Sequence, residues 1–308
     1  MVIINRQLNR PPLVSKGVST PTTAGTGIAD PTNAWNLNSG IKLLLYGQSG
    51  SGKTTFWATF PGPTLALICS GGNKPGELRS IDTPENRKKI TAKVITSIEQ
   101  LRGEIAGAGS YATVVLDHVT GFADLIIKEL LGLEEVPVGK SRIAGKGESW
   151  SLVSQQQYGQ MTIIAKEVLV KLLTLPGNVV VIGQERVFGG KEDAVQSDLI
   201  KPTVGVAVTP SLAGWLNPAC DYVMQIFKRP LMVAQPQITL QGKLQPVTYA
   251  RGKGVEYCAR CEPHEVYMTK FRKPGGKALP EVIVLGNSVD GVDPVGGYAK
   301  MMAVIQGK

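Results

Sequence analysis

Short apolar runs alternate along the chain with longer segments whose apolar residues recur at helical spacing. The runs that we interpret as buried strands are Leu43–Leu45, Thr64–Cys69 and Asn178–Gly183, with Tyr111–Asp117 as a central parallel strand and Lys93–Thr96 as a short strand candidate. The segments that we interpret as helices are Thr54–Phe60, Ser97–Ala106, Gly121–Leu131 and Val153–Leu175. Strands that are apolar on both faces belong to mostly parallel sheets covered by helices. The pattern therefore predicts an α/β fold with a mostly parallel central sheet flanked by helices.

The C-terminal part of the chain has a different pattern, with shorter strands and many turn residues. We expect strands at Asp221–Phe227, Val247–Ala250, Val266–Thr269 and Glu281–Leu285, and a short helix at Gly297–Ile305. Their spacing predicts β-hairpins at one end of the sheet. Residues 73–92 are polar and are expected on the surface, and residues 137–150 and 187–220 are expected to be long glycine-bearing loops.

These patterns divide the chain into three parts. Residues 1–38, rich in Pro, Thr, Asn and Gly, are expected to form an extended arm, residues 39–230 the α/β core, and residues 231–308 a basic β-rich extension. Two interpretations of the arm stay open. It is a disordered tail, or its apolar start at residues 2–4 adds a strand to a neighbouring subunit.

The most specific motif is a glycine-rich turn that directly follows the first apolar run. It has the P-loop spacing Gly-x-x-x-x-Gly-Lys-Thr, in which backbone N–H groups cradle phosphates, the lysine reaches the β- and γ-phosphates and the threonine hydroxyl binds Mg²⁺. The residues expected to bind the nucleotide are Gly47, Gln48, Ser49, Gly50, Ser51, Gly52, Lys53, Thr54 and Thr55.

A second motif supports the first. The run Tyr111–Asp117 ends in a carboxylate 64 residues after Lys53, as in the Walker B strand, whose aspartate reaches Mg²⁺. We therefore expect Thr54 and Asp117 to hold the metal ion. His118 follows directly, and it either contacts the phosphate or water, or merely makes a hydrogen bond at the strand end.

Polar residues also follow the strand predicted at Asn178–Gly183. In parallel α/β sheets, ligands lie beyond the carboxyl ends of the strands. This places Gln184 where it senses the γ-phosphate or the attacking water, or where it is simply a polar cap. Glu185 is the next residue. The expected catalytic residues are thus Lys53, Asp117, Gln184 and Glu185.

Composition limits the possible partners and the cellular compartment. No apolar run approaches the roughly 20 residues that span a membrane, and the N-terminus has no signal-peptide core. We therefore expect a cytoplasmic protein with four reduced cysteines. Cys258, Cys261 and His264 have metal-ligand spacing, but a zinc site needs a fourth ligand, so chance spacing is the favoured interpretation.

The charge favours an anionic partner. The net charge is +9, and the last 81 residues, from Lys228 onward, hold twelve Lys or Arg against six Asp or Glu. Such an excess suits nucleic acid, although many soluble proteins are mildly basic. Loops 137–150, with Trp150, and 187–207 are candidates for facing DNA. Lys270, Arg272 and Lys273 are candidates for DNA contacts or for reaching a neighbour's γ-phosphate.

Taken together, the P-loop, the Asp117 strand, the Gln184 strand and the Pro210–Asp221 stretch resemble the phage-encoded P-loop proteins with a RecA-like core, including the phage single-strand annealing ATPases. The resemblance covers residues 40–230. It implies a RecA-like P-loop NTPase fold, binding of ATP and Mg²⁺, action on single-stranded DNA in recombination, annealing or repair, homo-oligomers, and the cytoplasm of an infected bacterium. The preference for ATP is likewise an implication of the resemblance.

One departure from the RecA-like pattern leaves the activity open. Such proteins usually carry an acidic residue just after the second strand, whereas this chain has Cys69-Ser70-Gly71-Gly72 there. Glu77 is the nearest acidic residue, and Glu185 is another candidate base. An ATPase is therefore the first hypothesis. The alternatives are a nucleotide-gated structural or assembly protein with little turnover, and a P-loop small-molecule kinase.

Overall fold

The computed structural model describes residues 40–69, 76–133, 153–189, 203–238, 244–272, 278–287 and 296–307. The expected arm at residues 1–38, the loop 137–150 with Trp150, and Lys273 lie outside these ranges. Within them, no helix is both long and apolar enough to cross a membrane.

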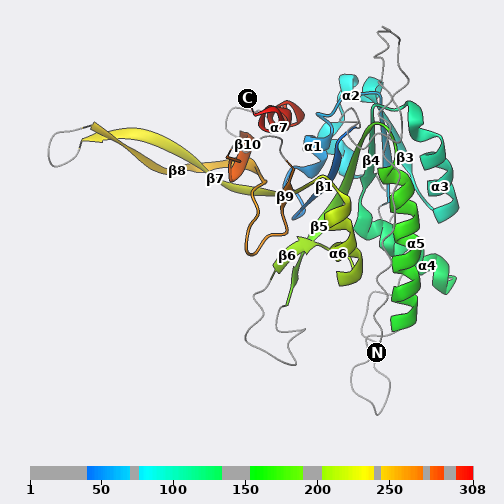
Figure 1. Cartoon of the computed structure of the whole chain (residues 1–308). Helices are drawn as coiled ribbons and strands as arrows, with labels where there is room; N and C mark the ends of the chain where they lie inside the picture. Colours follow the sequence, from blue (N-terminus) through cyan, green and yellow to red (C-terminus); the bar gives the residue numbers. More distant parts are fainter. Residues whose placement is uncertain are drawn as a thin grey trace, which may run out of the picture. The chain divides into compact units, whose positions relative to one another are not determined.

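A mixed sheet forms the centre of the described chain (Figure 1). Its strand order is β10-β8-β7-β1-β5-β4-β2-β3, and β7, β1, β5, β4, β2 and β3 are parallel neighbours. The bounds are β1 Lys42–Gly47, β2 Thr64–Ile68, β3 Ile90–Val94, β4 Thr113–Asp117, β5 Asn178–Phe188, β6 Thr203–Val206, β7 Tyr222–Ile238, β8 Leu244–Arg260, β9 Lys270–Phe271 and β10 Val282–Asn287. The predicted α/β class with a mostly parallel sheet is confirmed.

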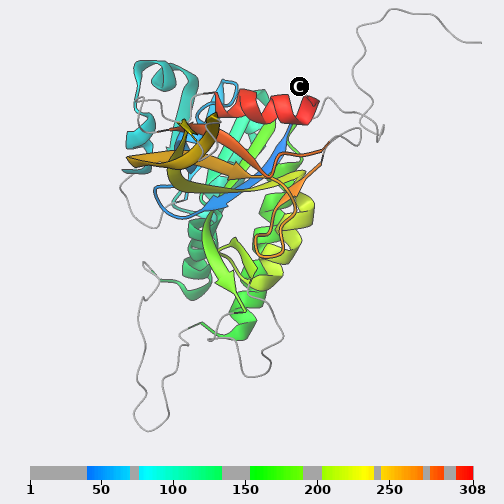
Figure 2. The same cartoon turned by 90° about the vertical axis from the view of Figure 1, so that its left-hand side faces the viewer.

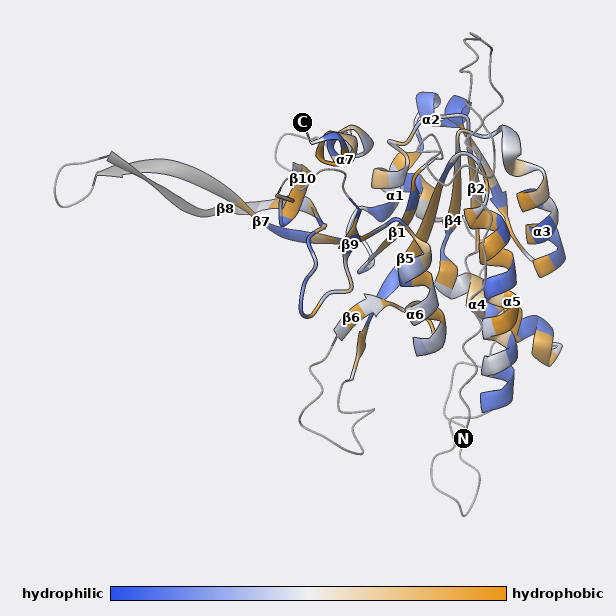
Figure 3. Ribbon diagram, viewed as in Figure 1, coloured by the Kyte–Doolittle hydropathy of each residue, from blue (hydrophilic) through white to orange (hydrophobic). Residues whose placement is uncertain are grey.

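Helices cover both faces of this sheet (Figures 1 and 2). One apolar cluster joins the strands to α3, α4, α5 and α6, and the other joins them to α1, η1 and α7. The bounds are α1 Lys53–Trp57, the 3-10 helix η1 Gly76–Ile81, α2 Pro84–Lys89, α3 Ile98–Ala106, the 3-10 helix η2 Ala108–Ser110, α4 Val119–Leu131, α5 Gln155–Leu173, α6 Pro210–Ala219 and α7 Gly297–Gln306. Figure 3 shows apolar residues concentrated on the strands and on helix faces turned to them.

The C-terminal strands form the predicted β-hairpin extension. β7 and β8 pair antiparallel from Gln225↔Arg260 to Ile238↔Leu244, with a register shift between Pro230 and Met232. Near the sheet, β7 also pairs with β1 and β8 with β10, whereas in the outer half the described pairing is between β7 and β8 themselves. This long ribbon is the C-terminal β-hairpin extension that the sequence predicts.

Several local expectations were wrong. The stretch 187–220 was expected to be a loop, but it contains β6 and α6. Gly214 and Pro218 are residues typical of loops, so the sequence pattern did not predict α6. Its apolar residues Leu212, Ala213 and Leu216 are nevertheless buried in the core. Residues 73–92, by contrast, were correctly expected on the surface: among the described residues of this stretch, Ile81 is the one that is buried, and the stretch contains η1, α2 and the start of β3. Instead of a strand at Val266–Thr269, the structure has a single bridge, Val204↔Tyr267, followed by β9.

A stability prediction follows from the packing of α4 on the end of β2. Gly121 is buried in α4, and a Cβ placed on it would lie 1.7 Å from the carbonyl oxygen of Cys69. Because backbone must move to relieve that clash, we expect Gly121→Ala to lower the free energy of unfolding by about 3 kcal/mol in urea denaturation. The matched control is Gly103→Ala in α3, where a Cβ meets nothing within 4 Å. It is expected to raise stability by up to about 1 kcal/mol, and equal effects of the two changes would contradict the packing argument.

Candidate nucleotide-binding site

The predicted site residues meet at one edge of the parallel strands, where β1 and β4 end and β5, contrary to the strand end expected at Gly183, continues to Phe188. β1, which leads into the P-loop, lies between β5 and β7, and Gly47 is directly opposite Gln184. β4 is the next strand after β5, and it ends at Asp117. Three motifs that are far apart in the sequence therefore face one space.

The P-loop needs its glycines for two physical reasons. A Cβ on Gly47 would lie 2.1 Å from the carbonyl oxygen of Ile226, because β7 runs close beside the start of the loop. Gly50 and Gly52 have φ angles of +71° and +97°, which other L-residues rarely adopt. These constraints shape a loop whose successive N–H groups can turn toward an anion.

Lys53 is held by the loop itself. Its Nζ donates to the carbonyl oxygens of Gly47 at 2.7 Å and Gln48 at 2.8 Å. Burial lowers the pKa of Lys53, and the carboxylates of Asp117 and Glu185 oppose this effect. A phosphate group placed beside the ammonium would favour its protonated form, so the residue suits an anionic ligand.

Asp117 is 4% exposed at the end of β4. Its Oδ2 accepts a hydrogen bond from Nε1 of Trp57 at 3.1 Å, which ties the helix after the P-loop to the Asp117 strand. Burial raises the pKa of Asp117, while the hydrogen bond from Trp57 and the charge of Lys53 act in the opposite direction. The peptide bond between Asp117 and His118 is cis.

A cavity of about 400 Å³ brings most predicted residues together, and we call it the nucleotide pocket. Its lining includes Ser49, Gly50, Gly52, Lys53, Thr54, Thr55, Asp117, His118 and Gln184. A hydroxyl and a carboxylate at Thr54 and Asp117 are the oxygen ligands that Mg²⁺ prefers. The donor set therefore fits a nucleotide with a magnesium ion, which Thr54 and Asp117 would hold.

His118 has a structural role whatever else it does. It is the N-cap of α4, and its Nδ1 accepts a hydrogen bond from the Gly121 amide at 2.8 Å. Burial and the nearby Lys53 lower its pKa. The imidazole thus lines the nucleotide pocket as a neutral group, and both interpretations from the sequence remain compatible with its position.

The two polar residues after Gly183 point to different cavities. Gln184 lines the nucleotide pocket, but Glu185 lines a neighbouring cavity of about 270 Å³ together with Gln48 and Ser51. Glu185 accepts hydrogen bonds from Gln225 Nε2 at 2.8 Å and from Gln48 Nε2 at 3.5 Å. The structure therefore brings Gln184, and not Glu185, to the cavity that holds Lys53 and Asp117.

Sequence reasoning missed two residues of the nucleotide pocket, Ser80 of η1 and Tyr257 of β8. Neither belongs to a phosphate motif. Tyr257 reaches the pocket because β8 pairs with β7, with Tyr257 opposite Lys228. No local signal distinguishes it from the other strand aromatics, since that pairing alone decides which of them faces the P-loop.

The basic residues expected to act on DNA or on a neighbour have partners within the chain. Lys270 Nζ donates to the carbonyl oxygens of Asn217 at 3.2 Å and Pro218 at 3.0 Å, at the end of α6. Such a cation stabilises a helix C-terminus. Arg272 forms an ion pair with Asp221 at 2.8 Å.

Of the three residues weighed as a zinc site, two are buried thiols and the third accepts a hydrogen bond from the backbone. Cys258 and Cys261 are free, buried thiols, and burial raises their pKa to about 11 and about 12. Nδ1 of His264 accepts from the Val266 amide at 3.0 Å. Within the described ranges, no three His, Cys, Asp or Glu side chains gather as metal ligands.

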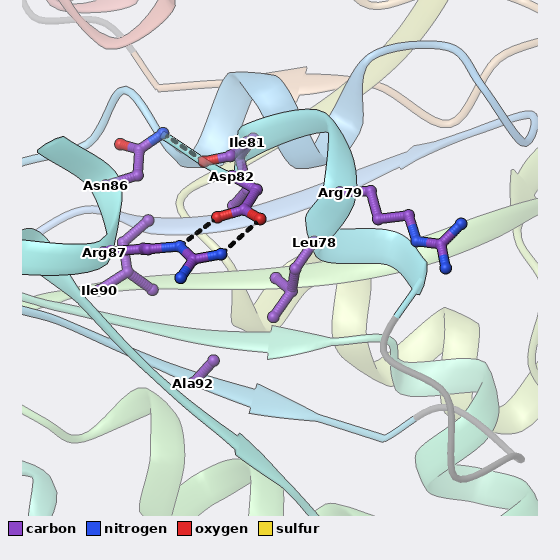
Figure 4. Close-up of a pocket in the computed structure, with 8 residues that line it drawn as sticks. All are labelled: Leu78, Arg79, Ile81, Asp82, Asn86, Arg87, Ile90 and Ala92. Carbon is purple, nitrogen blue, oxygen red and sulfur yellow. Dashed lines mark hydrogen bonds and ion pairs between the residues drawn. The ribbon is translucent and has the colours of Figure 1, made fainter. Parts of the chain in front are cut away.

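A further cavity of about 360 Å³ lies beside the edge strand β3 (Figure 4). Arg87 of α2 pairs with Asp82 there, with NH2 2.8 Å from Oδ2, and Arg79 points away from this pair. The lining is Leu78, Arg79, Ile81, Asp82, Asn86, Arg87, Ile90 and Ala92. It contains no P-loop residue, so the phosphate chemistry belongs to the nucleotide pocket.

Two solved structures illustrate what the chain is similar to. The RadB recombinase is 15% identical, with a TM-score of 0.32 over 71% of this chain and 87% of that one. The flagellar accessory protein FlaH from Methanocaldococcus jannaschii is 7% identical, with a TM-score of 0.36 over 80% of this chain and 85% of that one. Likenesses this low do not establish a shared function. No curated protein matches the chain.

The family assignment comes from the sequence profile of the AAA domain, which matches residues 39–272. The match contains the P-loop, Asp117 and Gln184, and it continues through β7, β8 and β9. The chain therefore belongs to the AAA domain family, as an ATP-binding P-loop protein.

Proposed function

We propose that the chain is an ATP-hydrolysing protein, of the kind encoded by phages, that acts on single-stranded DNA in recombination, annealing or repair. One observation carries the proposal. Gln184 and Arg186 lie two residues apart on β5, the first in the nucleotide pocket and the second in an open groove of about 550 Å³. An ATP-dependent shift at the end of β5 would therefore reach the groove directly.

This groove has the chemistry that single-stranded DNA requires. Lys166 of α5 and Arg186 supply positive charge, and Tyr158 is 45% exposed at the start of α5. Thr209 and Pro210 bring the start of α6 to the same groove. Cations neutralise the phosphates, and exposed aromatic rings stack on bases without regard to sequence.

The same proposal assigns roles at the nucleotide pocket. The P-loop amides and Lys53 bind the β- and γ-phosphates, Thr54 and Asp117 hold Mg²⁺, and Gln184 contacts the γ-phosphate or the attacking water. When bound, Mg²⁺ supplies charge neutralisation for the phosphates. Glu185 is the proposed base, and it would have to turn from Gln225 toward the nucleotide.

One observation favours a second candidate function, a nucleotide-gated assembly protein with little turnover. Asp117 is the single carboxylate among the described residues that line the nucleotide pocket. A carboxylate committed to a metal ion is not free to accept a proton from water. If hydrolysis is slow, ATP acts as a ligand that stabilises one conformation and not as a source of free energy.

We expect Mg-ATP hydrolysis that single-stranded DNA stimulates, and we expect Lys53→Ala to reduce it at least about 100-fold, because the phosphates lose their cation in the pocket. Phosphate release with and without an oligothymidylate measures both effects. Lys88→Ala in α2, which lines none of the cavities described above, is the control and should leave the rate unchanged. ATP binding without release under either condition would instead support the assembly protein.

A second prediction concerns the groove. We expect Arg186→Ala to weaken oligothymidylate binding and to reduce the slope of log affinity against log salt by about one, since one phosphate contact is lost. Fluorescence anisotropy at several salt concentrations measures this slope. Lys88→Ala serves again as the charge-matched control, and an equal effect of both variants would mean that only net charge matters.

A homo-oligomer, which the resemblance implies, belongs to the same proposal. We expect the molar mass in solution, measured by light scattering, to be a multiple of the 32.8 kDa chain in the presence of Mg-ATP and DNA. A monomer under all conditions would remove this part of the proposal and leave nucleotide binding untouched.

A further inference from the structure

The cavity that contains Glu185 lies against the P-loop, and we call it the flanking cavity. The P-loop contributes Gln48 and Ser51, β7 contributes Gln225 and Lys228, and β8 contributes Arg260. The P-loop thus has one face toward the nucleotide pocket and another toward the flanking cavity.

Ser51 indicates that a polar ligand completes this region. Its Oγ is buried, the residue is 2% exposed, and the hydroxyl has no hydrogen-bond partner among the described residues. Buried hydroxyls are normally paired, so an unpaired one inside a phosphate-binding loop points to a group that arrives with the ligand.

Two charged side chains of the flanking cavity are fixed by their neighbours. Arg260 donates from NH1 to Glu281 at 2.8 Å and from Nε to Gln225 at 3.3 Å. Its guanidinium also lies 5.0 Å from the Phe227 ring centroid and 4.7 Å from that of Tyr267. Glu185 is held by Gln225 and Gln48. Neither residue therefore offers a free cation to a phosphate.

Lys228 differs from both. It is exposed, and the structure gives its ammonium no hydrogen bond or ion pair with any described residue. A Cβ placed on Gly50 would lie 3.9 Å from Lys228 Nζ, and apart from Gly50 and its two chain neighbours no other described atom comes within 4 Å of that point. Because Gly50 also lines the nucleotide pocket, this free cation stands next to the phosphate-binding loop of its own chain.

The nucleotide pocket lacks a second cation of its own. Among its described lining residues, Lys53 is the single lysine or arginine, and Nδ1 of His118 accepts a hydrogen bond from the Gly121 amide. The transferred phosphoryl group spreads negative charge over its equatorial oxygens, and P-loop enzymes place a further cation there. Arg260, Lys270 and Arg272 are already engaged.

We propose that Lys228 contacts the terminal phosphate of ATP bound to the same chain and is a catalytic residue for its hydrolysis. This inference rests on the proposed function. In the reaction, the oxygen of water bonds to the γ-phosphorus while the bond to the β,γ-bridging oxygen breaks. ADP leaves with that electron pair, and phosphate and one proton go to solvent. Lys228 stabilises the charge and transfers no proton.

The first test compares Lys228→Ala, Lys228→Arg and the control Lys88→Ala. We expect Lys228→Ala to lower kcat about 100-fold and Lys228→Arg to retain activity within about tenfold. ADP lacks the γ-phosphate, so Lys228→Ala should leave ADP affinity unchanged and weaken binding of a non-hydrolysable ATP analogue. Equal effects on both nucleotides, or none, would overturn the inference. If the wild type does not hydrolyse ATP, the proposed function and the catalytic role of Lys228 both fail. The binding measurement then still tests whether Lys228 contacts the terminal phosphate.

The second test asks which chain Lys228 serves. Lys53→Ala and Lys228→Ala chains are mixed in equal amounts and ATP hydrolysis is measured. If Lys228 acts within its own chain, the mixture has no more activity than the sum of its parts. Recovery of activity would show that an intact Lys228 of one chain serves the nucleotide of another, and this would overturn the proposal.

Discussion

The parallel pairing of β1 with β5 on one side and β7 on the other is the constraint on which the site depends. It sets Gly47 opposite Gln184 and so close to Ile226 that a side chain at Gly47 would strike the β7 backbone. The P-loop therefore begins at the crowded centre of the sheet and must turn outward. The P-loop, Gln184 of β5 and Gln225 of β7 are thereby carried to the same edge.

Because Lys53 and Asp117 are buried at this edge, their charges are not fully compensated by the protein. The pKa of Lys53 is lowered and that of Asp117 is raised, both mainly by burial, so each charge costs free energy in the absence of a ligand. A triphosphate with its metal ion supplies what each lacks, an anion for Lys53 and a cation for Asp117. The hydrogen bond from Trp57 holds the carboxylate in place meanwhile.

Because side chains alternate along an extended strand, neighbouring residues of β5 face different cavities. Gln184, Glu185 and Arg186 line three different cavities in succession: the nucleotide pocket, the flanking cavity and the open groove. A single strand end is thus adjacent to the phosphates, to the polar network of Gln225 and Arg260, and to the proposed DNA surface. One strand therefore connects the nucleotide pocket to the polar network of Gln225 and Arg260 and to the proposed DNA surface.

The sequence by itself determined the parallel α/β core and the phosphate motifs, because buried strands, a glycine-rich turn and a strand-terminal aspartate are local patterns. It did not reveal α6, whose proline and glycine resemble a loop until its apolar face is packed. Only the tertiary structure separated Glu185 from Gln184, gave Lys270 and Arg272 internal partners, and brought Tyr257 and Lys228 beside the P-loop. These are consequences of strand pairing between distant segments, and the spacing of residues along one segment does not encode them.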